Sequence, residues 1–309
     1  MDSPPSAAPA ERSAPAPAAA TSVTACVVVR NEEAVIDRCL SSLDGVVQEI
    51  VLVHDGDCED RTLEIAARHG ARVFVQPLVG HAESATVFAF EQARGEWILS
   101  LDADEFLSPQ LRAQLPQLVA DPEVNGYELV WKMWDGRRYI SERGPYKLAL
   151  FRRSRVHVLG TVHAVEQVDP PVVRTQLHLE HRPLYDNFTL ALVLTKWRRW
   201  ARIQAREYLR DLADMPRFNW QGTPAWPRRR RVLNRLSPLL FPLYAPVAFA
   251  AHFLGSREIY SPRVNLRISF YHGLLASMTQ LYIAKYLYLG ADDDPASEPP
   301  RPVSASTYH

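Results

Sequence analysis

The sequence predicts an α/β protein with a mostly parallel sheet flanked by helices, followed by a helical C-terminal region. Strand and helix patterns alternate between residues 23 and about 105. Polar residues gather directly after several of the predicted strands. After residue 196 the chain becomes basic and then strongly apolar. Alternating strands and helices form βαβ units with right-handed crossovers, so the first part should be a parallel sheet.

The first predicted strand is the β-branched run over 23–29, which suits a strand buried on both faces. A helix is expected over 33–43, because apolar residues there recur at helical spacing. The alternation continues with strands over 49–53, 71–75 and 97–101 and with helices over 62–69 and 84–93. Ligands of such sheets bind at the carboxyl ends of the strands, where the polar clusters lie.

Composition excludes several classes of protein. The chain has 309 residues, with 35 Lys and Arg against 35 Asp and Glu, so its formal charge is zero. That balance disfavours a general nucleic-acid binder, and we expect no nucleic-acid partner. Three cysteines in a chain of this length do not indicate a disulfide framework, so a reducing compartment is expected.

The proline distribution divides the chain. Residues 1–20 hold five Pro and eight Ala without the apolar run of a signal peptide, and residues 291–309 hold four Pro and three Asp in a row. Both ends are expected to be disordered tails. The body should comprise a sheet domain over 21–195 and a helical region over 196–290.

The most informative cluster is Asp102, Asp104 and Glu105, directly after an apolar strand. If the chain stays extended there, alternation places Asp102 and Asp104 on one face. Paired carboxylates of this kind suit Mg²⁺ or Mn²⁺, which keep waters and bridge to substrate phosphates. The alternative is a solvated loop before a helix that begins at Ser108 and Pro109.

Two more polar segments follow predicted strands. Arg30, Asn31 and Glu32 come after the first strand, and residues 54–60 after the second. In the latter, Gly56 permits a tight turn between Asp55 and Asp57, whose carboxylates can accept hydrogen bonds from a base or ribose. The alternative is a loop closed by an Asp60 cap. No Gly-x-Gly-x-x-Gly and no P-loop motif is present, which disfavours dinucleotide and P-loop sites.

Four motifs occur in order along the first third of the chain. They are VVVRNEE at 27–33, CLSSL at 39–43, EIVLV at 49–53 with DG at 55–56 and DRT at 60–62, and GEWILSLDADE at 95–105. Through these motifs the chain resembles family 2 glycosyltransferases of the GT-A fold. The resemblance implies inverting transfer from a nucleotide-diphospho-sugar with a divalent metal. It places Asn31, Glu32 and Asp55 near the nucleotide, Asp102 near the ribose or metal, and Asp104 on the metal. His54 departs from the usual Asp, so Asp57 is a further candidate for the base contact.

The region that would receive the acceptor is similar to the lipopolysaccharide-core glucosyltransferase subgroup, through YKLALFRR at 146–153, GTVHAVE at 160–166 and LEH at 179–181. An inverting transfer needs a carboxylate or His to deprotonate the acceptor hydroxyl. The candidates are Glu166, His163 and Glu142, because Ala164 stands where the subgroup usually has Glu. His181 is a candidate metal or phosphate ligand.

The C-terminal region segregates charge. Between residues 196 and 235 twelve basic residues oppose three acidic ones, with tryptophans among them. Apolar segments follow at 239–254 and 267–289, and the first is shorter than the ~20 residues of a simple spanning helix. This order suits the anionic inner surface of a membrane. The alternatives are ordinary packing against the sheet and a true membrane span.

Together these observations predict a cytoplasmic glycosyltransferase, peripheral at the inner face of the cell membrane. It would move a sugar from a nucleotide-diphospho-sugar to a lipid-linked or cell-envelope glycan acceptor with Mg²⁺ or Mn²⁺. Two rivals stay open. A nucleotidyltransferase also uses paired carboxylates, although a Gly-rich triphosphate loop is missing. A degenerate domain acting as a membrane-associated scaffold would explain the departures at His54 and Ala164.

Overall fold

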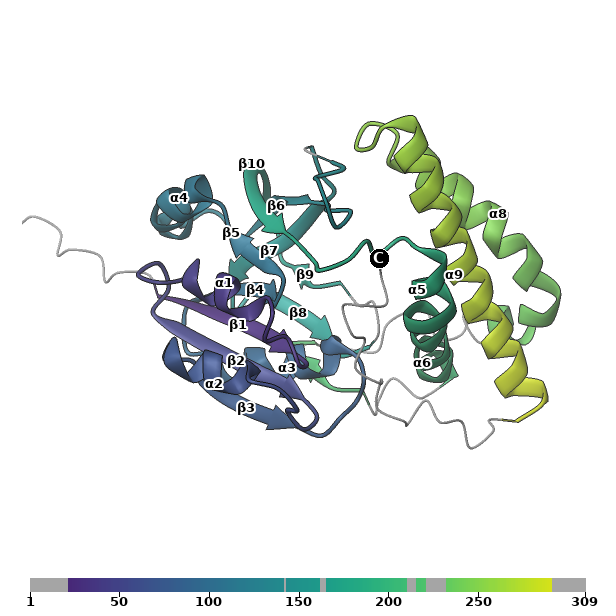
Figure 1. Cartoon of the computed structure of the whole chain (residues 1–309), viewed down its shortest axis with the longest axis horizontal. Helices are drawn as coiled ribbons and strands as arrows, with labels where there is room; N and C mark the ends of the chain where they lie inside the picture. Colours follow the sequence, from purple (N-terminus) through teal and green to yellow (C-terminus); the bar gives the residue numbers. More distant parts are fainter. Residues whose placement is uncertain (1–21, 142, 162–164, 210–214, 221–231, 291–309) are drawn as a thin grey trace, which may run out of the picture.

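The computed structural model describes residues 22–141, 143–161, 165–209, 215–220 and 232–290. A sheet flanked by helices forms one side of the molecule, and a group of C-terminal helices forms the other (Figure 1). The two expected tails, residues 1–20 and 291–309, lie outside the described residues.

The first half of the main sheet is parallel, as predicted. The strands are β1 (Val23–Val29), β2 (Glu49–Asp55), β3 (Arg72–Gln76) and β4 (Trp97–Asp102), in the order β3-β2-β1-β4. Their registers bring the ends of β1, β2 and β4 to one edge, with Val29 beside His54 and Val28 beside Asp102. The polar segments after these strands therefore meet, as strand order requires.

The second half of the sheet is mixed. Its strands are β5 (Glu105–Leu107), β6 (Gly126–Lys132), β7 (Tyr146–Arg152) and β10 (Val172–His181), which complete the order β4-β7-β6-β10-β5. β7 pairs antiparallel to β4 and to β6, and β10 pairs parallel to β6 and antiparallel to β5. A small sheet contains β8 (Val156–Leu159), β9 (Gln167–Val168) and β11 (Arg217–Phe218).

The helices between these strands agree with the predicted alternation. They are α1 (Ile36–Ser41), α2 (Thr62–Arg68), α3 (Ala82–Gln92) and α4 (Pro109–Ala120). α1 is shorter than the expected 33–43, because Glu32 to Val35 form a turn in which Val35 N–H donates to the Glu32 carbonyl. α4 begins as predicted, since the Ser108 hydroxyl accepts the Leu111 N–H at 3.2 Å and Pro109 opens the helix.

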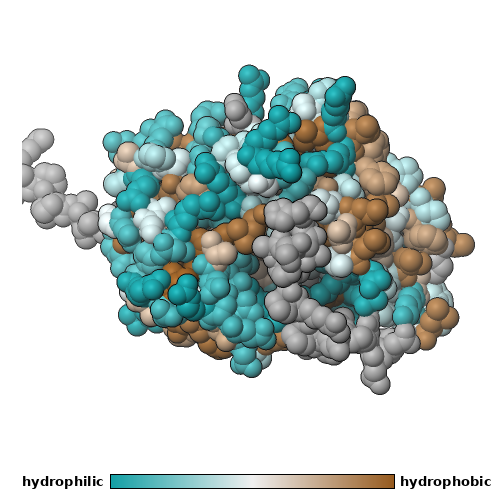
Figure 2. Space-filling view, in the orientation of Figure 1, coloured by the Kyte–Doolittle hydropathy of each residue, from teal (hydrophilic) through white to brown (hydrophobic). Residues whose placement is uncertain are grey.

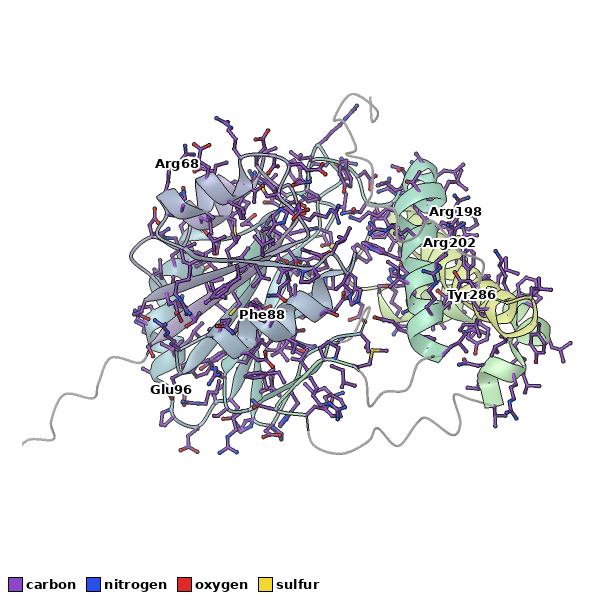
Figure 3. The ribbon with its side chains drawn as sticks, turned by 90° about the horizontal axis from the view of Figure 1, so that it is seen from below. Arg68, Phe88, Glu96, Arg198, Arg202 and Tyr286 are labelled. Carbon is purple, nitrogen blue, oxygen red and sulfur yellow. The ribbon has the colours of Figure 1, made fainter. Side chains whose placement is uncertain are left out.

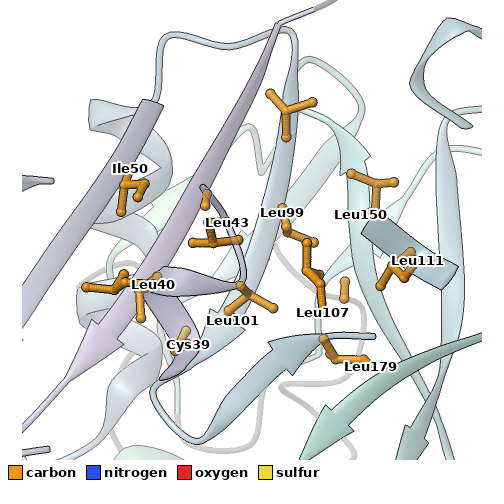
Figure 4. Packing of buried hydrophobic residues seen from close by; sticks show 14 of the residues in the cluster. Cys39, Leu40, Leu43, Ile50, Leu99, Leu101, Leu107, Leu111, Leu150 and Leu179 are labelled. Carbon is orange, nitrogen blue, oxygen red and sulfur yellow. The ribbon is translucent and has the colours of Figure 1, made fainter. Parts of the chain in front are cut away.

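Side chains alternate from β1 into two separate cores. Ala25, Val27 and Val29 pack with α1, α2 and α4 on one face, whereas Cys26 packs with α3 on the other. Figure 4 shows part of the first core, which includes Leu40 of α1 and Leu111 of α4. A strand buried on both faces has this continuous apolar pattern. The cysteines are all free, with Cys26 and Cys39 buried, so no disulfide holds this layer.

The C-terminal helices form a layer of their own. They include α5 (Leu190–Leu192), the π-helical segment η1 (Val193–Trp197), α6 (Arg198–Leu209), α8 (Ser237–Gly255) and α9 (Pro262–Tyr288). α8 and α9 are antiparallel neighbours and come very close, since a Cβ on Gly273 would lie 2.7 Å from the Ala245 carbonyl oxygen. The predicted boundary between residues 195 and 196 falls inside η1.

Among the described residues, several contacts join this helical layer to the sheet side. A hydrophobic cluster connects Met133 and Phe188 with Trp197, Tyr260 and Ile268. In addition, the buried His81 ring before α3 contacts Glu207 of α6 at 3.0 Å and Glu83 at 3.0 Å. Within the described ranges, no helix is long and apolar enough to cross a bilayer.

Candidate active site

A cavity of about 920 Å³ lies between the carboxyl ends of the parallel strands and the C-terminal helices. Residues from the ends of β1, β2 and β4 form one wall, and residues of η1, α8 and α9 form the opposite one. Arg30, Glu32, Asp55, Asp102, Asp104 and His181 line it, so the structure brings together six of the side chains singled out in the sequence.

His54 has a structural role at the cavity edge. Its ring is fully buried, the Nδ1 atom lies 2.8 Å from the Gly56 carbonyl oxygen, and the Asn31 N–H donates to Nε2 at 3.2 Å. One donor nitrogen and one acceptor nitrogen are what a neutral imidazole offers. His54 therefore braces the loop after β1 against the loop after β2, a role that an Asp cannot fill in the same way.

Asp55 and Asn31 also accept hydrogen bonds from backbone N–H groups of neighbouring loops. Asp55 accepts the N–H groups of Val79 at 2.7 Å and Gly80 at 2.9 Å, and the Asn31 side-chain oxygen accepts the Glu59 N–H at 2.9 Å. Asn31 adopts a left-handed φ of 51°, which Asn tolerates better than most residues. Asn31 and the exposed Asp57 are not among the lining residues, so their nucleotide contacts remain predictions.

Asp60 closes the loop before α2. It accepts the Thr62 N–H at 2.9 Å, as the expected loop closure requires, although Arg61 occupies the N-cap position itself. The Glu32 N–H donates to the Thr62 hydroxyl at 2.7 Å, so the loop after β1 is also tied to α2. Both loops are thus fixed before any ligand binds.

The carboxylate segment turns sharply, so the expectation of an extended chain from Asp102 to Asp104 is wrong. β4 ends at Asp102, residues 103 and 104 form a turn, and Glu105 begins β5. The Asp102 N–H donates to Glu105 Oε2 at 2.9 Å. This bond to a buried carboxylate closes the turn and presents both aspartates to the cavity.

Lys147 of β7 offsets the negative charge of Glu105 and Asp102 at this turn. Its Nζ donates to both Glu105 oxygens at 2.8 and 2.7 Å and to Asp102 Oδ2 at 3.1 Å. Burial raises the pKa of Glu105 to about 7, although Lys147 opposes the shift. The two carboxylates raise the pKa of Lys147 against the effect of burial, so Lys147 stays charged.

Asp104 forms a second pair with His181 at the end of β10. Their Oδ2 and Nε2 atoms are 3.5 Å apart. Burial disfavours the charge on each, yet the His181 contact holds the pKa of Asp104 below its usual range, and Asp104 raises the pKa of His181. The other ring nitrogen, Nδ1 of His181, is buried without a hydrogen-bond partner among the described residues.

These residues fit a divalent cation that is shared with substrate. Within the described part of the chain, no group of three His, Cys, Asp and Glu side chains is arranged to hold a metal. Mg²⁺, however, is usually held by one or two carboxylates together with waters and substrate phosphates. Asp104, Asp102 and His181 supply such a set of oxygen and nitrogen donors at the cavity wall.

Of the three candidate bases, only Glu166 lies within the described residues, and Glu142 and His163 lie outside them. Burial raises the pKa of Glu166, while the charges of Lys147 and Asp102 act on it in opposite directions. Glu166 is not among the residues that line the cavity, so its role as the base stays a prediction, although a raised pKa is what a general base needs.

Sequence reasoning did not single out the opposite wall of the cavity. Aromatic side chains there include Trp197, Tyr260 and the stacked rings of His252 and His272, whose centroids are 4.2 Å apart. Trp131 of β6 and Phe188, which precedes η1, also line the cavity. The only sequence signal for the C-terminal rings is the aromatic character of their segments. These groups come from strands and helices far apart in the chain, so no local motif joins them.

The fold and the cavity are typical of α/β proteins whose ligand site lies at the carboxyl ends of the parallel strands. The carboxylates that line this cavity are of the kind that suits a divalent cation together with a diphosphate. Residues 24–177 match the family described as glycosyl transferase family 2. The chain belongs to glycosyltransferase family 2 through this domain, which confirms the family resemblance.

Curated relatives agree with that assignment. An uncharacterized glycosyltransferase of Rickettsia bellii is 32% identical over 105 residues, which cover 34% of this chain and 35% of that protein. The lipopolysaccharide core biosynthesis glycosyltransferase LpsC of Rhizobium meliloti is 31% identical over 174 residues, which cover 52% of this chain and 64% of that protein. The match to the Rickettsia protein thus spans only about a third of its length.

Among solved structures, residues 1–349 of TarS from S. aureus align with this fold at a TM-score of 0.40 and 12% identity. The alignment covers 86% of this chain and 91% of that structure.

Proposed function

We propose that this protein is an inverting, metal-dependent glycosyltransferase of the GT-A type. It transfers a sugar from a nucleotide-diphospho-sugar to a lipid-linked or cell-envelope glycan acceptor. The observation that carries the proposal is the cavity itself, in which the carboxylate turn of a family 2 domain faces an aromatic wall. The LpsC relative, named for lipopolysaccharide core biosynthesis, supports an envelope glycan as acceptor.

The donor half of the mechanism rests on the strand ends. Arg30, Glu32 and Asp55 line the cavity, and we assign the nucleotide to this part of it; Asp55 also accepts the N–H groups of Val79 and Gly80. Asp104, with Asp102 and His181, would hold Mg²⁺ or Mn²⁺, which supplies charge neutralisation for a diphosphate. Glu105 and Lys147 keep the turn in place, so the aspartates need no rearrangement when substrate arrives.

Glu166 is the proposed base among the described residues. In an inverting transfer it takes the acceptor proton while the acceptor oxygen attacks the anomeric carbon from the side opposite the leaving group. Its raised pKa makes it a stronger proton acceptor than an ordinary carboxylate. The aromatic wall formed by Trp131, Phe188, Trp197 and Tyr260 would bind the apolar faces of acceptor sugars.

The acceptor side would sit on the inner face of an anionic membrane. α8 has no charged side chain in its 19 residues, and the exposed apolar residues Leu239, Leu243, Val247 and Leu254 lie along it. The hydrophobic surface gathers on the side of α8 and α9 (Figure 2). Exposed Arg257 and Arg263 flank the turn between these helices. An apolar helix face bordered by arginines suits the interface of anionic lipid.

Calorimetric titration with UDP-, GDP- and dTDP-sugars, with and without Mn²⁺, tests the donor assignment. We expect one of them to bind in Mn²⁺ and to be slowly hydrolysed by the protein alone. If no nucleotide sugar binds, the enzyme proposal is wrong and the scaffold hypothesis gains.

Flotation with liposomes tests the membrane assignment. We expect the protein to float with vesicles that contain phosphatidylglycerol and to stay at the bottom with pure phosphatidylcholine. Neutral replacement of Arg228 to Arg231, which lie outside the described residues, should reduce flotation. Flotation that is unchanged by this replacement would contradict the electrostatic part of the proposal.

A further inference from the structure

Lys196 reaches the cavity from outside the family domain. It lies in η1, beyond the matched residues 24–177, and lines the same cavity as Asp104 and Glu32. Trp197, the next residue, lines the cavity too. A π-helical turn is wider than an α-helical one and is frequently found at functional sites. The family match alone therefore does not account for this cation.

The charge of Lys196 acts on the carboxylates of the opposite wall. Burial and the neighbouring Asp104 raise the pKa of Glu32 to about 7, and Lys196 opposes that shift. Burial also opposes the charge of Asp104, whereas His181 first and then Lys196 stabilise it. Lys196, Glu32 and Asp104 all line the cavity, so the ammonium group and these carboxylates share one space.

Aromatic neighbours hold Lys196 in place. Its Nζ donates to the Tyr185 hydroxyl at 3.4 Å and lies 4.7 Å from the centroid of the Trp200 ring. No carboxylate of the described residues lies within ion-pair distance of this Nζ, in contrast to Lys147 on the other wall. A lysine ammonium carries three donors, so bonds remain for a ligand.

We propose that Lys196 binds the phosphoryl oxygens of the diphosphate leaving group. This inference rests on the proposed function. In the transfer, the bond between the anomeric carbon and the diphosphate oxygen breaks, and its electron pair stays on that oxygen. The acceptor oxygen bonds to the anomeric carbon and loses its proton to the base. Negative charge thus grows on the diphosphate, and Lys196 stabilises it while keeping its own proton.

Arg198 offers a matched control two residues further along the chain. It is cationic like Lys196 but exposed, does not line the cavity, and stands at the start of α6 (Figure 3). Arg198→Gln therefore removes the same charge from the same segment without touching the proposed site.

The test compares nucleotide diphosphates with nucleosides. UDP, GDP and dTDP are titrated into the full chain, with and without Mn²⁺, and the one that binds is compared with its nucleoside. Lys196→Gln should weaken diphosphate binding about 10- to 100-fold, as loss of a charged hydrogen bond does. Nucleoside binding should not change, Lys196→Arg should restore part of the loss, and Arg198→Gln should have no effect.

The outcomes separate the two proposals. If the unmodified protein binds no nucleotide diphosphate, the proposed function fails. If it binds one and Lys196→Gln binds it equally well, only the role of Lys196 is overturned. Equal losses for diphosphate and nucleoside would also overturn it, because they indicate a structural effect. If Lys196→Gln loses affinity for inorganic phosphate but not for the diphosphate, the site belongs to an acceptor phosphate, and the leaving-group assignment is wrong.

Discussion

The sheet side and the helical side of the molecule differ in where their charged and apolar side chains lie. Between residues 44 and 128 the sheet side has sixteen acidic residues against five basic ones, and those that line the cavity each have a partner in the chain, as Asp102 has in Lys147. On the helical side, α8 is uncharged and leaves apolar side chains exposed. The sheet side satisfies its charges within the chain, whereas the helical side leaves an apolar surface for something else to cover.

The largest effect should come from the sheet wall at Asp104. Asp104→Asn keeps the shape of the side chain but removes the charge that would hold the cation, and should slow nucleotide-sugar hydrolysis about 10³-fold. Hydrolysis is measured by release of the nucleotide in Mn²⁺. Glu91→Gln, on the exposed face of α3, is the control. Equal rates for Asp104→Asn and the unmodified protein would mean that this carboxylate holds no catalytic metal.

Lys147 tests whether the sheet wall depends on internal charge pairing. Lys147→Met leaves the fully buried Glu105 without a cation and should lower the free energy of unfolding by about 4 kcal/mol. Urea denaturation measures this. The double variant Lys147→Met with Glu105→Leu should recover most of the loss, because no buried charge then remains unpaired. A double variant as unstable as the single one would point to packing instead of charge.

His81 tests the contact that joins the two walls. Burial opposes its charge, but Glu207 and Glu83 raise the pKa of His81 to about 9. The unfolded value is about 6.5, so this stabilisation is complete below that pH and is lost as pH rises through the folded pKa. The free energy of unfolding should fall by about 3 kcal/mol between pH 6.5 and pH 9.5.

Urea denaturation across this pH range, with His81→Gln as comparison, measures the effect. The variant should be less stable at pH 6.5 and should show a flatter pH dependence. A slope that His81→Gln leaves unchanged would assign the effect to another group.

The smallest effect is expected on the apolar face of α8. Leu243→Ser, at an exposed position, should weaken binding to phosphatidylglycerol vesicles about tenfold without changing nucleotide binding. Vesicle sedimentation measures the first and calorimetry the second. Val75→Ser, at an exposed apolar position on β3, serves as control. If Leu243→Ser binds vesicles normally, the exposed face of α8 is not the lipid contact.

Much of the sheet side could be predicted from the sequence. The strands over 23–29, 49–53 and 97–101 are continuous apolar runs, and their parallel order follows from the helices between them. That order also predicts which strand ends meet, and Arg30, Asp55 and Asp104 do line one cavity. Local patterns and topology suffice where a site is built from consecutive strand ends.

The rest depends on contacts between distant segments. Lys147 is 42 residues from Glu105, and no spacing rule connects them. The sequence predicts an extended chain at Ala103 and Asp104, whereas the structure has a turn. The turn depends on the bond from the Asp102 N–H to the Glu105 carboxylate, which forms only because the fold buries Glu105. The replacement at His54 was interpreted as a lost ligand, whereas its ring braces two loops that only the fold brings together.

α8 carries both an outer and an inner surface. Leu243, Val247 and Leu254 are exposed on the outside, while His252 and Gly255 line the cavity. An α-helix with its side chains is about 10–12 Å wide. If lipid covers the outer surface, the hydrocarbon boundary and the reaction chamber are separated by a partition one helix thick. A glycan whose anchor stays in the membrane would then need only its first few sugars to reach across.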